Sequence, residues 1–98
     1  MFSQKDLADL VDSERDAHLS FLQSLIRTPS ANPPGDTRKA VNVVQQHLTE
    51  HGIHSEIVAP KPDAPNLVSL LHEHDTSGKG RNLVLNGHID HFPVSDPS

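Results

Sequence analysis

The sequence predicts an α/β fold in which two helical segments precede three short strands. Over the first half of the chain, apolar residues recur at helical spacing, and a Pro- and Gly-containing stretch divides that half in two. The second half instead holds short apolar runs separated by Pro- and Gly-rich stretches, as is typical of strands and turns. This order suits the start of a sheet flanked by helices.

The first helix is expected from about Lys5 to Arg27, with a break near Asp12-Ser13, where Ser13 would cap a second segment. It ends at Thr28-Pro29, because the residue before a proline is pushed out of the α region. Its apolar face, interleaved with charges, consists of Leu7, Leu10, Val11, Ala17, Phe21, Leu22, Leu25 and Ile26.

The second helix follows the loop from Ser30 to Gly35, and Asp36 or Thr37 is expected to cap its first turn. It ends before Gly52-Ile53, since the glycine suits a left-handed conformation and the isoleucine can pack back on the last turn. The apolar face of this helix is expected to consist of Ala40, Val41, Val44 and Leu48.

Three strands are predicted after the second helix. Ile53 to Val58 alternates apolar and polar residues, which indicates a half-buried strand, and Asn66 to Leu71 forms the next one. Asn82 to Leu85 is the most apolar run and is predicted to be the most central strand. Residues 60–65 and 77–80 are expected to form the intervening turns.

Size and composition allow one small domain over residues 1–98, with a flexible start over 1–4 and no second domain. At 98 residues and 34% hydrophobic content, the chain lies near the lower end of what supports a stable core. It is therefore expected to be a piece of a larger domain or a subunit that relies on partners. A net charge of −5 argues against nucleic acid.

The sequence contains neither a secretory signal nor an apolar run of membrane-spanning length, so a soluble cytoplasmic protein is expected. It contains no cysteine, which excludes disulfides and thiolate metal sites. Any metal would therefore be held by histidine and carboxylate side chains.

The residues that point to chemistry lie directly after the third predicted strand. His88 and Asp90 stand two residues apart, so on an extended strand both would point to the same face. There an imidazole nitrogen could hold a metal while the carboxylate orients the ring. Gly87 would let the backbone come close to a ligand at the edge of the sheet. The alternative is a plain turn in which Asp90 caps nearby backbone, and residue chemistry alone leaves both interpretations open.

The remaining histidines have structural explanations. His47 and His51 have the i, i+4 spacing of a helical zinc site, but no glutamate follows His47, so the metalloprotease helix signature is absent. His18 fits a helical pattern, and His54 is expected to face solvent. The cluster at residues 72–75 lies in a polar loop, where a hydrated loop tip is favoured over a metal site.

Four segments in order resemble the amino-terminal part of a family of zinc metallohydrolases and metallopeptidases. That family includes acetylornithine deacetylase, succinyl-diaminopimelate desuccinylase, aminoacylases, carnosine-type dipeptidases and glutamate carboxypeptidases. The resemblance covers the chain from about Leu25 onward, and its most specific part is the strand-Gly-His-x-Asp-x-x-Pro segment. The segments are Thr28 to Asp36, Glu50 to Ile53, Pro65 to Leu70 and Leu83 to Asp90.

The resemblance implies roles for two residues and a larger fold around them. His88 matches the first metal ligand of the family, and Asp90 matches the catalytic-site acid that hydrogen-bonds this ligand and tunes the metal. His91 stands where relatives have an aliphatic residue, which would change the pocket wall. The fold would comprise the first helices and strands of a mixed-sheet metallohydrolase catalytic domain, incomplete in this chain.

The implied chemistry is hydrolysis of an amide bond, in an N-acylated amino acid or small peptide, by a metal-activated water. Two zinc ions would be present, with cobalt or manganese as alternatives. The remaining ligands, the Glu base and the domain that forms a homodimer in the family would lie beyond Ser98, so the chain alone is expected to be inactive. Neither nucleic acid nor membrane is an expected partner.

Two other hypotheses remain open. The chain could be a small non-catalytic interaction or assembly protein of the same ancestry, with the acidic first helix and exposed strand edges as contact surfaces. It could also be a histidine-rich metal buffer.

Overall fold

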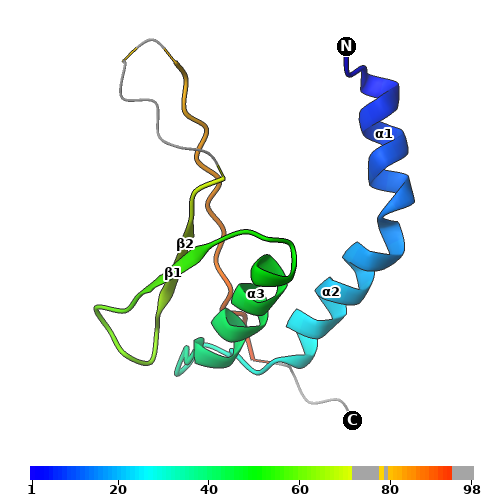
Figure 1. The fold of residues 1–98 in the computed structure, drawn as a ribbon. Coiled ribbons are helices and arrows are strands. Elements are labelled where there is room, and N and C mark those ends of the chain that lie inside the picture. The colour runs from blue at the N-terminus through cyan, green and yellow to red at the C-terminus, as the bar shows by residue number, and fades with distance from the viewer. Residues whose placement is uncertain (72–77, 79, 94–98) are drawn as a thin grey trace.

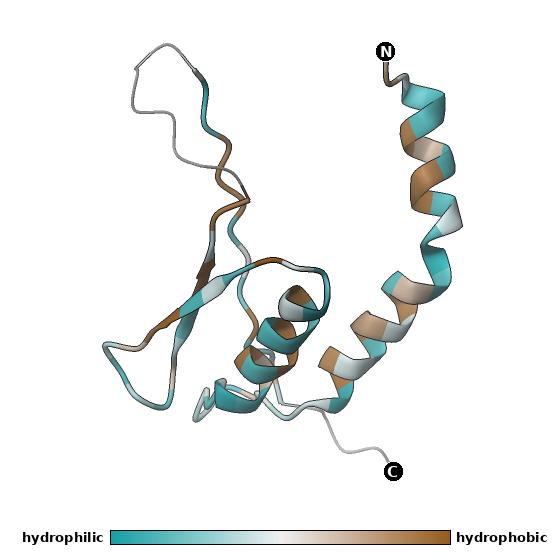
Figure 2. Ribbon diagram, viewed as in Figure 1, coloured by the Kyte–Doolittle hydropathy of each residue, from teal (hydrophilic) through white to brown (hydrophobic). Residues whose placement is uncertain are grey.

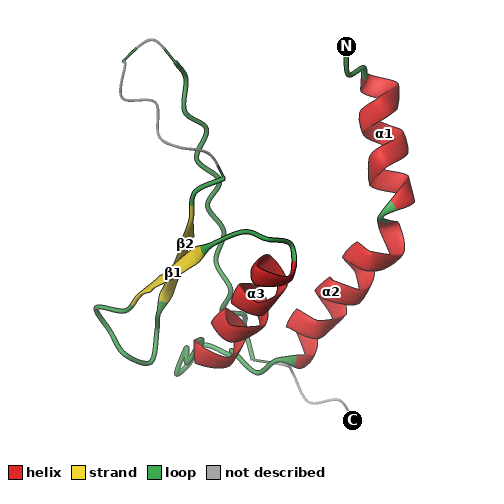
Figure 3. Ribbon diagram, viewed as in Figure 1, coloured by secondary structure: helices red, strands yellow, loops and turns green. Residues whose placement is uncertain are grey.

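The computed structural model describes residues 1–71, 78 and 80–93, and it confirms the predicted α/β class (Figure 1). Three helices come first: α1 (Gln4–Ser13), α2 (Arg15–Arg27) and α3 (Arg38–Glu50). Two strands follow, β1 (Ser55–Val58) and β2 (Asn66–Ser69), and they form an antiparallel pair (Figure 3). The cluster predicted at residues 72–75 lies outside the described residues.

The predicted break in the first helix is confirmed, but its cap is not the predicted one. Glu14 ends α1 and precedes α2, with φ −103° and ψ 9°, and no side chain caps α2. Ser13 is the last residue of α1, and its hydroxyl donates to the carbonyl of Leu10 in its own preceding turn. The start of α1 is instead fixed by a capping box between Ser3 and Asp6.

Interactions between residues close in sequence account for both ends of α3. Thr37 occupies the N-cap position without a side-chain bond, and Asp36 instead accepts from the backbone N–H of Arg38 at 3.1 Å. At the other end Gly52 has φ +72°, and Ile53 donates to the carbonyl of Leu48 at 2.8 Å. This is the predicted glycine-terminated helix end.

The sheet is small and largely exposed. Ser55 pairs with Ser69 and Val58 with Asn66, so the register is continuous over four residue pairs. The predicted alternation of burial in the first strand is wrong, because only Ser55 is buried and the other three residues of β1 are exposed. In the described part of the chain, α3 contacts both strands of this pair, and the last three residues of β1 stay exposed.

The predicted central strand at Asn82 to Leu85 is also wrong for this structure. The segment has no strand assignment, and Leu83, Val84 and Leu85 are 84%, 82% and 82% exposed. A strand requires a neighbour whose N–H and C=O groups complete the ladder. Neither β1 nor β2 pairs with these residues, so their apolar character alone does not make them a strand.

The core is centred on α3. Ala40 and Val41 are the buried apolar residues identified among the described residues, and each is 1% exposed. Phe21 of α2 stacks on His47 of α3, with ring centroids 3.9 Å apart. Figure 2 shows further apolar residues along α1 and α2, and most of these are exposed, whereas Leu25 is half-buried. The exposed ones are Leu7, Leu10, Val11, Leu19, Leu22 and Ile26.

Within the described part of the chain, no helix combines the length and the hydrophobicity needed to span a membrane.

Candidate functional site

The segment that carries the predicted site residues returns to the loop after α2. Ala31 and His91 form an isolated parallel bridge, so residues distant in sequence lie side by side. The backbone N–H of Asn32 donates to the carbonyl of His91 at 2.8 Å, and the N–H of His91 donates to the carbonyl of Ser30 at 3.2 Å. In Figure 1 the orange-red end of the described chain accordingly runs past the start of α3.

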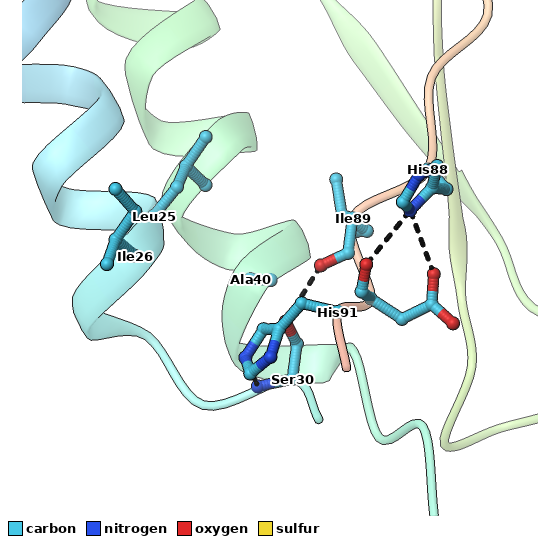
Figure 4. A pocket seen from close by; sticks show the side chains of 8 residues that line it. Leu25, Ile26, Ser30, Ala40, His88, Ile89 and His91 are labelled. Carbon is cyan, nitrogen blue, oxygen red and sulfur yellow. Dashed lines mark hydrogen bonds and ion pairs between the residues drawn. The ribbon is translucent and has the colours of Figure 1, made fainter. Parts of the chain in front are cut away.

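Ser30 strengthens this junction with its side chain. It is 3% exposed, and its hydroxyl donates to the carbonyl of Ile89 at 2.7 Å. Its backbone N–H donates to Nε2 of His91 at 3.4 Å, a long bond (Figure 4). Ser30 therefore binds residues 89 and 91 from one position, which fixes the stretch of backbone that presents Asp90.

His88 and Asp90 are in contact, as the predicted shared face requires. Nδ1 of His88 lies 3.2 Å from Oδ1 of Asp90 and 2.9 Å from the backbone carbonyl of Asp90. Both of these oxygens can only accept, so Nδ1 must carry the ring proton. In this tautomer Nε2 carries a lone pair, and none of the described residues bonds to it, on a side chain that is 86% exposed. The chemistry of this nitrogen is that of an available metal ligand.

Asp90 is held from its other side by Asn32. The side-chain amide of Asn32 donates from Nδ2 to Oδ2 of Asp90 at 3.0 Å. The hydrogen bond from Asn32 has the largest effect on the pKa of Asp90 and lowers it below its ordinary value; desolvation opposes this, and the weaker hydrogen bond from His88 lowers the pKa further. The carboxylate therefore stays ionised at neutral pH and can accept from both neighbours.

A groove of about 360 Å³ lies beside this pair (Figure 4). Its apolar lining comes from α2, α3 and the returning segment: Leu25, Ile26, Ala40 and Ile89. Its polar lining consists of Ser30, His88, Asp90 and His91. His91, for which the resemblance implies a place in the pocket wall, is one of the residues that line this groove. The groove therefore combines an apolar surface with the imidazole of His88, whose Nε2 bonds to none of the described residues.

The other histidines are not brought to this site. His47 and His51 lie together on α3 with ring centroids 4.4 Å apart, but His51 uses Nδ1 on the carbonyl of His47. His54 faces solvent as predicted, 86% exposed. His18 pairs with Glu14 at 3.3 Å on α2. Among residues 1–71, 78 and 80–93, no group of three or more side chains could hold a metal together.

Two residues of the site could not be identified from spacing. Ser30 and Asn32 precede the His-x-Asp motif by about sixty positions, as their separations of 59 and 58 residues from Ile89 and Asp90 show. The one signal in the sequence was the Asn-Pro-Pro-Gly loop, which supported the resemblance without a role for its asparagine. The structure shows that this loop contacts the carboxylate directly.

A comparison of the sequence with known proteins found a protein of similar sequence. The chain is 30% identical over 93 residues to the N-formyl-4-amino-5-aminomethyl-2-methylpyrimidine deformylase of Halalkalibacterium halodurans. The match includes 94% of this chain but 22% of that protein, so the chain spans about a fifth of the length of its relative. No protein-family model matches the chain, and no solved structure matches it.

Proposed function

We propose that this chain is the amino-terminal part of a zinc-dependent amidohydrolase or peptidase that cleaves an amide bond in an N-acylated amino acid or small peptide. The observation that carries the proposal is the state of His88, whose Nδ1 is engaged by Asp90 while Nε2 bonds to none of the described residues. The similarity to a deformylase supports the same class, because removal of a formyl group from nitrogen is the cleavage of an amide bond.

His88 and Asp90 are suited to form part of a zinc site. A histidine ligand that donates its other ring nitrogen to a carboxylate is the usual arrangement around catalytic zinc. His88 supplies the nitrogen and Asp90 the carboxylate. A catalytic zinc takes about three protein ligands, whereas the described residues hold no such group. The remaining ligands, for two ions in all, would come from outside these residues, and cobalt or manganese could replace zinc.

Zinc bound at such a site supplies a water of lowered pKa and polarises the amide carbonyl. The residues of this chain would orient the metal. Asp90 keeps the proton on Nδ1 of His88 and raises the basicity of the ring through its negative charge. Ser30 fixes the backbone on both sides of Asp90, so the carboxylate and the imidazole keep their relative position.

Zinc titration of the full chain by calorimetry tests the role of His88. We expect weak binding, because one ligand leaves the ion mostly hydrated, and we expect His88→Ala to remove it. His54→Ala is a matched control: His54 also precedes a carboxylate by two residues, is equally exposed at 86%, and lies 4.0 Å from Glu56 without a closer contact. Equal losses in the two variants would favour the metal-buffer hypothesis and contradict a defined ligand at His88.

Activity and gene sequence test the rest of the proposal. The isolated chain is expected to show no turnover of N-formyl or N-acetyl amino acids with zinc. Strong zinc-dependent amidase activity from these 98 residues would contradict the proposed incompleteness. A reading frame that continues past Ser98 with an aspartate and later a Glu-Glu pair would support the enzyme, and a stop codon at that point would count against it.

The exposed apolar face of α1 and α2 favours a second candidate, a non-catalytic interaction protein. Leu10, Val11 and Leu22 are each about half exposed, at 46%, 52% and 51%. An apolar helix face in water favours association. Sedimentation of the full chain at increasing concentration distinguishes the two, since a specific assembly would reach a fixed stoichiometry without zinc.

A further inference from the structure

The Asn-Pro-Pro-Gly loop has a direct contact with the proposed metal-binding pair. Asp90 divides its two oxygens between two partners: Oδ2 accepts from Nδ2 of Asn32 at 3.0 Å, and Oδ1 faces Nδ1 of His88 at 3.2 Å. A carboxylate accepts only, so it is the amide nitrogen of Asn32 that must face it. The three side chains therefore form one chain of hydrogen bonds from the loop to the free imidazole nitrogen.

The loop holds Asn32 in place through its backbone and through Gly35. The N–H of Asn32 donates to the carbonyl of His91, and the N–H of Gly35 donates to the carbonyl of Ala31 at 2.9 Å. Gly35 has φ +79°, and a Cβ built on it would lie 3.2 Å from Cγ of Asn32. The absence of a side chain at this glycine therefore leaves the space in which the Asn32 side chain reaches Asp90.

We infer that Asn32 is a positioning residue: it fixes the carboxylate of Asp90 so that the other oxygen stays on Nδ1 of His88 and Nε2 points to the ligand. Without this donor, the Asp90 side chain can rotate about its single bonds more freely, since the other side chain that contacts it is the exposed ring of His88. The inference depends on the proposed function only for the identity of the ligand. The positioning itself can be measured without metal.

The first measurement uses the metal-free full chain and nuclear magnetic resonance. In the wild-type chain, the Hα–Hβ couplings of Asp90 should report one rotamer, and the ring nitrogen shifts of His88 should report the Nδ1–H tautomer at a pH about two units above the ordinary histidine pKa. Asn32→Leu keeps a similar volume and removes the donor. We expect averaged couplings at Asp90 and a larger share of the Nε2–H tautomer at His88.

A structural role and a positioning role predict different results for the backbone. If Asn32 only supports the loop, Asn32→Leu will speed hydrogen exchange at the His91 amide, which donates to Ser30. If it positions Asp90, exchange at His91 stays as in the wild-type chain while the Asp90 couplings average. Unchanged Asp90 couplings and His88 ring shifts in Asn32→Leu would overturn the inference. Averaged couplings accompanied by a loss of protection at the His91 amide would overturn it as well, because the whole junction would then have opened.

Two glycine variants provide a matched pair. Gly35→Ala should reproduce the effect of Asn32→Leu on Asp90, because the new Cβ displaces Asn32. Gly52→Ala introduces the same left-handed strain, at φ +72°, but has nothing within 4 Å of its Cβ, so it should leave Asp90 unchanged. An equal response to both variants would contradict displacement of Asn32 as the cause.

Zinc affinity gives a second readout. Loss of a residue that hydrogen-bonds a metal ligand lowers the metal affinity roughly tenfold to a hundredfold. Asn32 bonds Asp90 and not His88 itself, so we expect a smaller decrease in zinc affinity, about threefold to tenfold, in Asn32→Leu. A wild-type chain that binds no zinc would refute the proposed function, yet the couplings of Asp90 would still decide whether Asn32 positions it.

Discussion

Replacing Ser30 by alanine is expected to loosen residues 89–91 from the loop after α2 while the helices stay folded. The Ser30 hydroxyl is buried and donates to the carbonyl of Ile89 at 2.7 Å. Alanine removes this donor and leaves the carbonyl without it, at a cost of about 1–2 kcal/mol. Since the segment is attached through a few hydrogen bonds, the cost falls on its local opening and not on global unfolding.

Hydrogen exchange at two amides measures this opening. The N–H of His91 donates to the carbonyl of Ser30, and the N–H of Asn32 donates to the carbonyl of His91, so both are freed when the segment detaches. A cost of 1–2 kcal/mol corresponds to a factor of about 5–30 in the opening equilibrium. We therefore expect both amides to exchange about 5–30 times faster in Ser30→Ala.

Ser24→Ala is the matched control. The hydroxyl of Ser24 also donates to a backbone carbonyl, that of Ser20 at 3.1 Å, but within α2 and in solvent. Alanine is the better helix former by a few tenths of a kcal/mol, so this variant should leave exchange at His91 unchanged. Unchanged exchange in Ser30→Ala, or an equal effect of both substitutions, would refute the assigned role of the Ser30 hydroxyl.

Two further outcomes concern α3. Val41→Ala should lower the free energy of unfolding by about 2–3 kcal/mol in urea titrations, because a buried side chain loses two carbon atoms and leaves a void. Val11→Ala, at an exposed position of α1, should change this free energy by less than about 0.5 kcal/mol. Hydrogen bonds from Arg38 lower the pKa of Asp36 from 3.8 to about 2, so its ionised form favours the folded state above pH 3.8, and this contribution is lost as the pH falls toward 2. Helicity followed by circular dichroism should fall over that range, and Asp36→Asn should reduce this dependence.

Local features of the fold were predictable because short stretches of sequence determine them. The end of α2 at Thr28 and the glycine-terminated end of α3 both follow from backbone preferences within a few residues. Burial was less predictable, because it depends on what lies opposite an apolar face. The apolar run at Leu83 to Leu85 is exposed for this reason.

The site was predictable in part for the same physical reason. His88 and Asp90 are two residues apart, so their contact follows from local geometry. Their support by Ser30 and Asn32 depends on a return of the chain that no local pattern encodes. The first turn of α3 shows the same limit on a smaller scale: Thr37 occupies the N-cap position, but the side chain that accepts from this turn is that of Asp36, and the sequence allowed either.

The return of the chain to the loop after α2 has a thermodynamic consequence. Bringing Asp90 to Asn32 closes a loop of 58 residues. The length-dependent part of its entropy cost is about 3–4 kcal/mol. The hydrogen bonds of the junction, with a net value of about 1 kcal/mol each, oppose this cost and set the balance between the closed and the open form. A ligand that binds only the closed form shifts such a balance in proportion to the logarithm of its concentration. An ion that binds His88 in the closed form alone would therefore stabilise the junction between residues 89–91 and the loop after α2. Protection of the His91 amide from exchange would then report the fraction of chains with bound ion.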